Sequence, residues 1–324
     1  MHARGRAAEA RLVGFDSMLD TSILLQILWT GIATATYGVL LAAAFSLVLK
    51  VVKVWNFAQA GMMGIAYYTL YACVQKAGLP IALALVIAVG VTIGVALAIE
   101  TFGLQTFRRR KSPSLTYFIF TLLLSELVQY VLAMIFGTEP VSLATTAGSD
   151  STMIAGVIVS TWDVMAMLAT VVCLALLYGV LRRTRYGKHM TAVADNPELS
   201  QLYGMSVTRI YALTFSLAAV LVVVAMVLFG TRASMVPETP LRMMLAAVIA
   251  ALLGGMDNLV GAALAALFLS LLQSFSVLFI PSAWQGLILY ALLFVTILFF
   301  PRGVKLPKLR ARGKPSAKIA ASTV

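Results

Sequence analysis

The sequence predicts an all-α membrane protein: a polytopic helix bundle with eight or nine membrane elements. Of its 324 residues, 61% are hydrophobic and only 11% are charged, whereas soluble domains are about half apolar and a quarter charged. A soluble fold could not bury so much apolar surface, so the bilayer has to act as the solvent. In addition, fifteen of the 24 Lys and Arg residues lie in three clusters that follow apolar segments, at 108–111, 182–188 and 302–318.

Nine apolar segments follow one another along the chain. They are expected at 22–49, 56–74, 80–107, 114–136, 154–181, 210–229, 241–253, 259–280 and 284–300. Segment 241–253 is short for a full crossing, which needs about 20 residues. We expect one membrane domain over 22–304, with a short leader at 1–21 and a basic tail at 305–324.

The charged residues set the expected orientation. Basic clusters mark the cytoplasmic side of a bundle, and the loop 137–151, with Glu139 and Asp150 but no basic residue, is expected outside. Alternation of the segments then places the N-terminus outside and the C-terminus inside. The net charge of +12 is explained by this topology, so we expect lipid and no nucleic acid as partner.

The sequence offers no catalytic or metal site. Cys73 and Cys173 each lie inside an apolar segment, and His2 and His189 are far apart. No paired nucleophile and base stands out. No phosphate-binding loop of the form G-x-x-x-x-G-K-[ST] occurs, so we expect neither an enzyme nor a cofactor, ATP included.

The polar segment 182–209 predicts a short helix at 197–203. Asn196 suits the N-cap, Pro197 the first turn and Glu198 the helix N-terminus, since each stabilises or tolerates the unpaired N–H groups there. Gly204 suits the position just past the C-terminus. Two interpretations remain open: a docking helix for a cytoplasmic partner, or a helix lying on the membrane interface or on its own bundle.

An apolar face favours docking. The spacing of Leu199, Leu202 and Tyr203 puts all three on one side of this helix, because residues three and four apart are neighbours on a helix surface.

Several motifs in this chain resemble one family. The residues of the polar segment that carry the resemblance are Arg183, Thr184, Gly187, Met190, Ala192, Ala194, Leu202, Gly204 and Met205. They are similar to the cytoplasmic loop of permeases in the branched-chain amino acid ABC transporter family. Further stretches agree in order, at 54–59, 64–67, 253–262 and 300–303, so that the resemblance covers about 23–304. Ala60, Asp257 and Val260 depart from the family pattern.

The resemblance implies a function and a set of partners. The chain would be the permease subunit of an importer in the bacterial inner membrane, carrying branched-chain or other small amino acids, short amides or urea by alternating access. It would work with a second homologous permease, two cytoplasmic ATPase subunits that bind the ATP, and a periplasmic substrate-binding protein. The loop 182–209 would hold the coupling helix, with contacts from Asn196, Pro197, Glu198, Leu199, Leu202, Tyr203 and Gly204.

A self-sufficient secondary transporter or channel is the alternative. That class shows interrupted helices and intramembrane ions. The stretches 56–64 and 254–257 could be such interruptions, but Glu126 is the only clearly central carboxylate.

Eight residues are candidates for the translocation path. Polar amides and glycines in apolar segments permit a broken helix only where it lines a cavity or is buried in protein. Polar contacts between helices are the alternative role, and for Glu126 we favour bonding to a helix or subunit over substrate contact. The candidates are Asn56, Gln59, Gly61, Gly64, Glu126, Gln129, Gly254 and Gly255.

Overall fold

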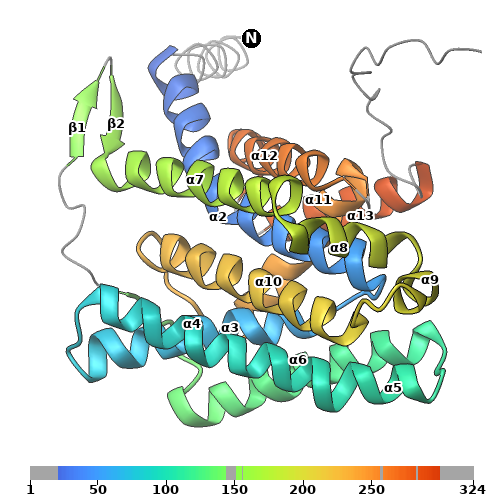
Figure 1. Ribbon diagram of the computed structural model, residues 1–324. Helices are drawn as coiled ribbons and strands as arrows, with labels where there is room; N and C mark the ends of the chain where they lie inside the picture. The colour runs from blue at the N-terminus through green and yellow to red at the C-terminus, as the bar shows by residue number, and fades with distance from the viewer. Residues whose placement is uncertain (1–20, 144–150, 155, 256–257, 282–283, 300–324) are drawn as a thin grey trace, which may run out of the picture.

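The computed structural model describes residues 21–143, 151–154, 156–255, 258–281 and 284–299 (Figure 1). The predicted leader (apart from residue 21), the basic tail and Asp257 lie outside these residues. The α-helices are α2 (Thr21–Val52), α3 (Ala58–Tyr71), α4 (Ile81–Ala98), α5 (Gln105–Arg109), α6 (Ser114–Phe136), α7 (Thr161–Arg183), α8 (Arg185–Asp195), α9 (Pro197–Leu202), α10 (Val207–Gly230), α11 (Thr239–Gly254), α12 (Leu259–Ser276) and α13 (Gln285–Phe299). Two π-helical turns, η1 (Ala72–Lys76) and η2 (Ile99–Leu104), extend α3 and α4.

The prediction of an all-α polytopic membrane protein is confirmed. Within the described residues, six helices are long and apolar enough to cross a membrane, and α11 is apolar but shorter. The predicted eight or nine elements are therefore more than the six or seven that helix length supports. The helix α13, with 15 residues, is shorter than the roughly 20 residues of a full crossing. The helix α3 has 14 residues and approaches that length only together with η1, which adds five.

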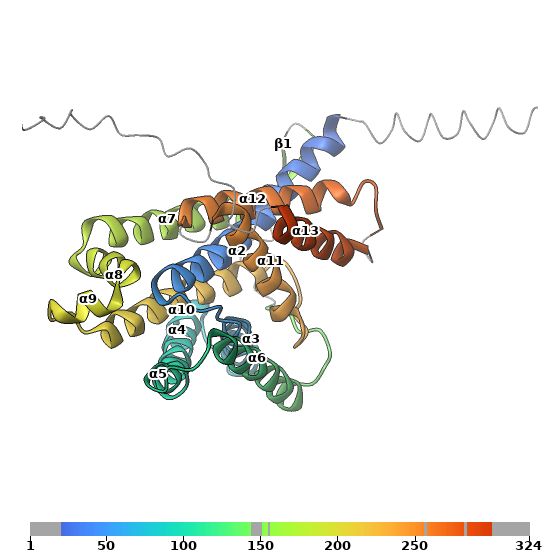
Figure 2. The same ribbon diagram turned by 90° about the vertical axis from the view of Figure 1, so that its right-hand side faces the viewer.

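The core of the bundle lies along α2, α3 and α10. In Figure 2 these helices occupy the middle, with α7 on one side, α4 and α6 on another, and α12 and α13 on a third. Ala42, Ala43 and Ala44 of α2 are completely buried, because small side chains let neighbouring helices approach closely in lipid. By contrast, only 17% of the residues in the most apolar stretch of α6 are buried, and the share for α7 is the same. Their outer faces are those expected to meet lipid.

One predicted boundary is wrong. The fifth apolar segment was expected to be helical from residue 154, but Ser151–Ile154 (β1) and Val157–Ser160 (β2) form an antiparallel hairpin. The β-branched run in β2 favours a strand, and Gly156 takes the positive φ of +80° that the turn needs. The helix α7 starts only at Thr161, where the Ser160 hydroxyl accepts a bond from the Trp162 backbone N–H at 3.3 Å.

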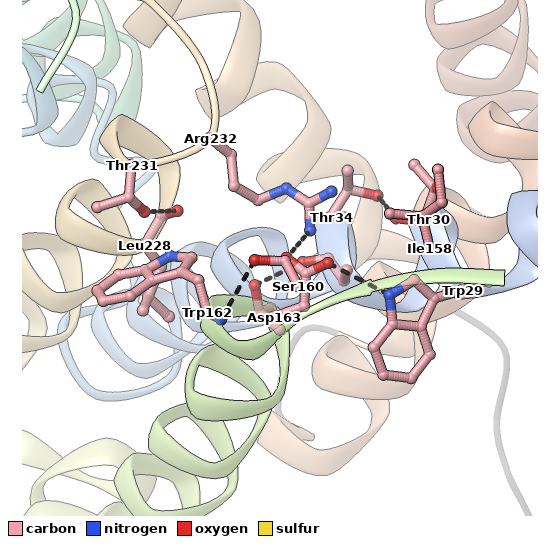
Figure 3. A network of polar contacts seen from close by, with 12 residues as sticks. Trp29, Thr30, Thr34, Ile158, Ser160, Trp162, Asp163, Leu228, Thr231 and Arg232 are labelled. Atoms are coloured by element: carbon pink, nitrogen blue, oxygen red, sulfur yellow. Dashed lines mark hydrogen bonds and ion pairs between the residues drawn. The ribbon is translucent and has the colours of Figure 1, made fainter. Parts of the chain in front are cut away.

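A polar network ties the helices together near this hairpin (Figure 3). Asp163, in the first turn of α7, is buried. Its carboxylate accepts hydrogen bonds from Trp29 Nε1 at 3.2 Å and from the Arg232 guanidinium at 2.6 Å. Because a buried carboxylate is costly without partners, this network holds α2, α7 and the end of α10 together. We call this end of the bundle the hairpin end.

A second ion pair lies toward the other end, which we call the loop end because it carries α8 and α9. Glu100, fully buried in η2, pairs with Arg108 of α5. The Arg108 guanidinium also stacks over the Tyr211 ring at 4.4 Å. The pair therefore links η2 and α5 to α10.

Candidate functional site

The segment that joins α7 to α10 is a helical pair at the loop end. Its first member, α8, was not predicted. Thr184 caps it, since its hydroxyl accepts a bond from the Gly187 N–H at 3.2 Å. A Cβ on Gly187 would lie 2.3 Å from the Leu181 backbone oxygen. The sharp turn between α7 and α8 therefore requires a glycine at this position.

One face of α8 is packed against the bundle. Met190, Val193 and Ala194 are buried, and α8 contacts both α2 and α10. Four residues of the quoted loop pattern, Thr184, Gly187, Met190 and Ala194, thus have structural roles as cap, close approach and core. They hold α9, the second helix of the pair, in place.

The predicted helix at 197–203 is confirmed, and it ends one residue earlier. In α9, the Asn196 side chain accepts a bond from the Leu199 N–H at 3.0 Å, and Pro197 occupies the first turn. Past its end, Gly204 has a φ of +78°. The sequence signals for the start and the stop of this helix therefore act as expected.

The two faces of α9 differ in their surroundings. Ser200 is buried, and its hydroxyl donates to the Asn196 carbonyl at 2.8 Å. On the other face, Leu199, Leu202 and Tyr203 are 49%, 84% and 77% exposed. An apolar face is thus presented at the loop end, and nothing in the described part of the chain covers it.

Asn56 and Gln59 are buried where the chain turns from α2 into α3. Both side chains are at most 1% exposed. The Gln59 amide donates to the Leu41 carbonyl at 3.3 Å, but its oxygen and both polar atoms of Asn56 have no partner among the described residues. Buried polar atoms without partners are uncommon in native folds, so this turn remains a candidate functional position.

Three other path candidates meet elsewhere. Gly61, Gly64 and Gln129 line a small crevice between α3, α6 and the start of α11. Glu126 is partly exposed on α6. No hydrogen bond joins it to Gln129 or to another residue in the described structure. The structure therefore brings Gly61, Gly64 and Gln129 together and leaves Glu126 apart from them.

Gly254 and Gly255 shape the turn between α11 and α12. A Cβ on Gly254 would lie 2.1 Å from the Gly261 carbonyl carbon, and Gly255 has a φ of +92°. Both positions thus demand glycine for backbone reasons.

A cavity of about 590 Å³ lies among α2, α11, α12 and α13. This volume falls in the range of small-molecule sites. None of the eight predicted path residues lines it. The lining residues on α2 are spaced i, i+3, i+4 and i+7, so they share one helix face, but this mixed set of side chains carries no sequence signal that marks a cavity. The lining residues are Thr34, Tyr37, Gly38, Leu41, Arg242, Met243, Ala246, Ala247, Ala266, Leu269, Ser270, Gln273, Gly286 and Tyr290.

An apolar multi-helix bundle with a cavity that opens to the surface and an exposed apolar helix face at one end fits a membrane permease. The chain matches the family described as branched-chain amino acid transport system / permease component over residues 27–297, and it belongs to that family. It is therefore the permease component of an ABC importer, a multi-pass membrane protein of bacterial type that has no catalytic activity of its own.

The individual relatives that match most of this chain share only about a quarter of its residues. The permease protein LivH of Salmonella typhimurium, from a high-affinity branched-chain amino acid transport system, is 24% identical over 86% of this chain and 94% of its own. The permease protein BraD of Pseudomonas aeruginosa, from a system of the same description, is also 24% identical, over 86% and 95%. The autoinducer 2 import permease LsrC of Klebsiella pneumoniae is 33% identical over 34% of each chain.

Proposed function

We propose that this permease carries branched-chain or other small aliphatic amino acids inward by alternating access, and that α9 couples it to a cytoplasmic ATPase. The exposed face of Leu199, Leu202 and Tyr203 carries the coupling role. A membrane protein gains nothing from presenting an apolar face to water, so a partner is expected to cover it. The same face is held in a fixed position by the Asn196 cap and by buried Ser200.

The free energy needed to switch a transporter between its two states favours a separate energy source. Inverting a two-state gate from 1:99 to 99:1 takes about 5.5 kcal/mol of differential binding. A small solute held loosely in a cavity would not supply this alone. Two ATPase subunits, a second homologous permease and a periplasmic binding protein are the partners that such a cycle needs.

The substrate proposal rests on two relatives that cover most of the chain. LivH and BraD are both named for branched-chain amino acid transport. LsrC, named for autoinducer 2 import, matches only about a third of the chain. We therefore place aliphatic amino acids before autoinducer-like solutes.

Reconstitution tests the proposal. Proteoliposomes that hold the complete complex should accumulate labelled leucine, isoleucine or valine only under two conditions. ATP must be present on the side of the membrane where the ATPase subunits lie, and the binding protein must be present. Vesicles with this chain alone should neither hydrolyse ATP nor concentrate these solutes. Accumulation by the chain alone under a proton or sodium gradient would instead favour a secondary transporter.

A further inference from the structure

The cavity among α2, α11, α12 and α13 has a polar end and an apolar end. Arg242 begins its wall on α11, and Thr34 on α2 and Gln273 on α12 lie on the same side, toward the hairpin end. At the other end the wall is formed by Leu41, Ala247 and Ala266. The seven steps of helical rise from Thr34 to Leu41 give a depth of about 10 Å along α2.

The direction of the helices supports this assignment. Gly31 lies against Ser274, and Gly38 lies nearest to Ser270, so α2 and α12 run antiparallel. The α2 residues near the hairpin therefore lie beside the C-terminal half of α12. Because α11 follows the turn that contains Arg232, its first residues, Arg242 among them, also lie at the hairpin end.

Several polar side chains of the cavity are available to a ligand, although the Thr34 hydroxyl already donates to the Thr30 carbonyl at 2.9 Å. Within the described residues, no hydrogen bond engages the side chains of Tyr37, Ser270 or Gln273. Arg242 has one weak contact, to Glu238 at 3.7 Å, and both side chains are largely exposed. Arg242 lies in the first turn of α11, where a long basic side chain reaches the water interface, and at the mouth of the cavity its planar fork suits a carboxylate.

We propose that this cavity is the solute-binding site of the permease and that Arg242 selects solutes with a carboxylate head. The aliphatic part of the solute extends toward Leu41 and Ala247, and Gln273 and Ser270 hydrogen-bond the head. The inference rests on the proposed function and deepens it, because it names the site and the chemical group that is recognised. A neutral solute of the same shape has no partner for the guanidinium and binds more weakly.

Thiol labelling of Ala246 tests the charge at this site. The full-length chain would carry Ala246→Cys with Cys73→Ser and Cys173→Ser, in membrane vesicles from cells that make the whole transporter. We expect an anionic methanethiosulfonate reagent to react faster than a cationic one of similar size. Arg242→Gln should lower the ratio of the two rates about fivefold, as expected for one nearby charge. Arg242→Lys should keep it, and Arg110→Gln at the loop end is the matched control.

Protection tests the head group directly. We expect 4-methylpentanoate to slow the labelling of the Ala246→Cys chain and 4-methylpentan-1-ol, which lacks only the carboxylate, to have little effect. Arg242→Gln should remove the difference. Equal protection by both compounds, protection by neither, or a rate ratio that Arg242→Gln leaves unchanged would overturn the inference. These outcomes do not depend on ATP-driven uptake, so failure of the importer function would be seen separately in reconstitution.

Discussion

At the residue scale, Gly187 shows how a single missing side chain fixes the geometry of the loop between α7 and α10. The backbone of α8 passes so close to the end of α7 that a Cβ at this position would lie within 2.5 Å of the Leu181 backbone. Because backbone atoms cannot yield as a flexible side chain does, substitution has to displace α8 as a whole. Asn196 and Gly204 then set the start and stop of the following helix.

Replacing Gly187 should therefore destabilise the protein. We expect Gly187→Ala to cost about 2 kcal/mol, as overpacking does in a tight core. Thermal unfolding of the detergent-solubilised chain measures this. The matched control is Gly179→Ala in α7, where a Cβ meets nothing within 4 Å. That change should be neutral or slightly stabilising, because alanine is the better helix former. Equal losses at both positions would contradict the close approach.

Some residue roles could be predicted and others could not. The cap at Asn196 is a local signal, readable from four consecutive residues. Asp163 was not singled out, although it is buried and paired with Arg232. The two residues are 69 positions apart. Their pairing depends on which helices are neighbours, and no local pattern carries that information.

At the element scale, α8 and α9 divide the work of the loop. The first, with Met190 and Val193 buried, attaches the loop to α2 and α10. The second presents its apolar face outward. The sequence contains a helical pattern for α8, since Val193 and Ala194 follow Met190 by three and four residues. The pattern is hard to recognise because the residues around it are polar. The hairpin at Ser151–Ser160 was missed for the opposite reason, because its apolar residues continue into those of α7.

The exposed face of α9 gives a sharp test of coupling. Leu202→Asp places a charge in a contact that we propose is desolvated, which should cost about 3 kcal/mol of association with the ATPase. Because Leu202 is 84% exposed in this chain alone, the bundle should still fold and insert. The expected result is normal abundance in the membrane, loss of ATPase co-purification and loss of uptake.

Gln201→Asp is the matched control for this change. It adds the same charge to the same helix, at an exposed position beside the apolar face, and it should keep most of the uptake. Ser200 would be a poor control because it is buried. Full uptake and a retained ATPase in the Leu202→Asp protein would mean that α9 lies on the membrane surface instead.

At the scale of the whole molecule, the sequence predicts the class well and the arrangement poorly. Each of the nine apolar segments contains a helix in the described structure, because bilayer-spanning chain must satisfy its own backbone and helices do so locally. Which helices surround a cavity depends on packing between distant segments. Six of the eight predicted path residues lie in or beside α3 and α6, and Gly254 and Gly255 lie at the end of α11. The cavity of about 590 Å³ lies among α2, α11, α12 and α13, and none of the eight lines it.

The orientation of the bundle follows from charge and remains a prediction that labelling can decide. The helix α7 is long enough to span the membrane, so the hairpin before it and α9 after it should lie on opposite sides. Met153 of the hairpin is 74% exposed and Leu202 is 84% exposed, so a cysteine at either position is accessible. With Cys73 and Cys173 replaced by Ser, Met153→Cys should react with an impermeant thiol reagent in intact spheroplasts. Leu202→Cys should react only after the membrane is opened, because the basic cluster that begins at Arg182 predicts a cytoplasmic position for that end. The reverse pattern would remove the basis for coupling through α9.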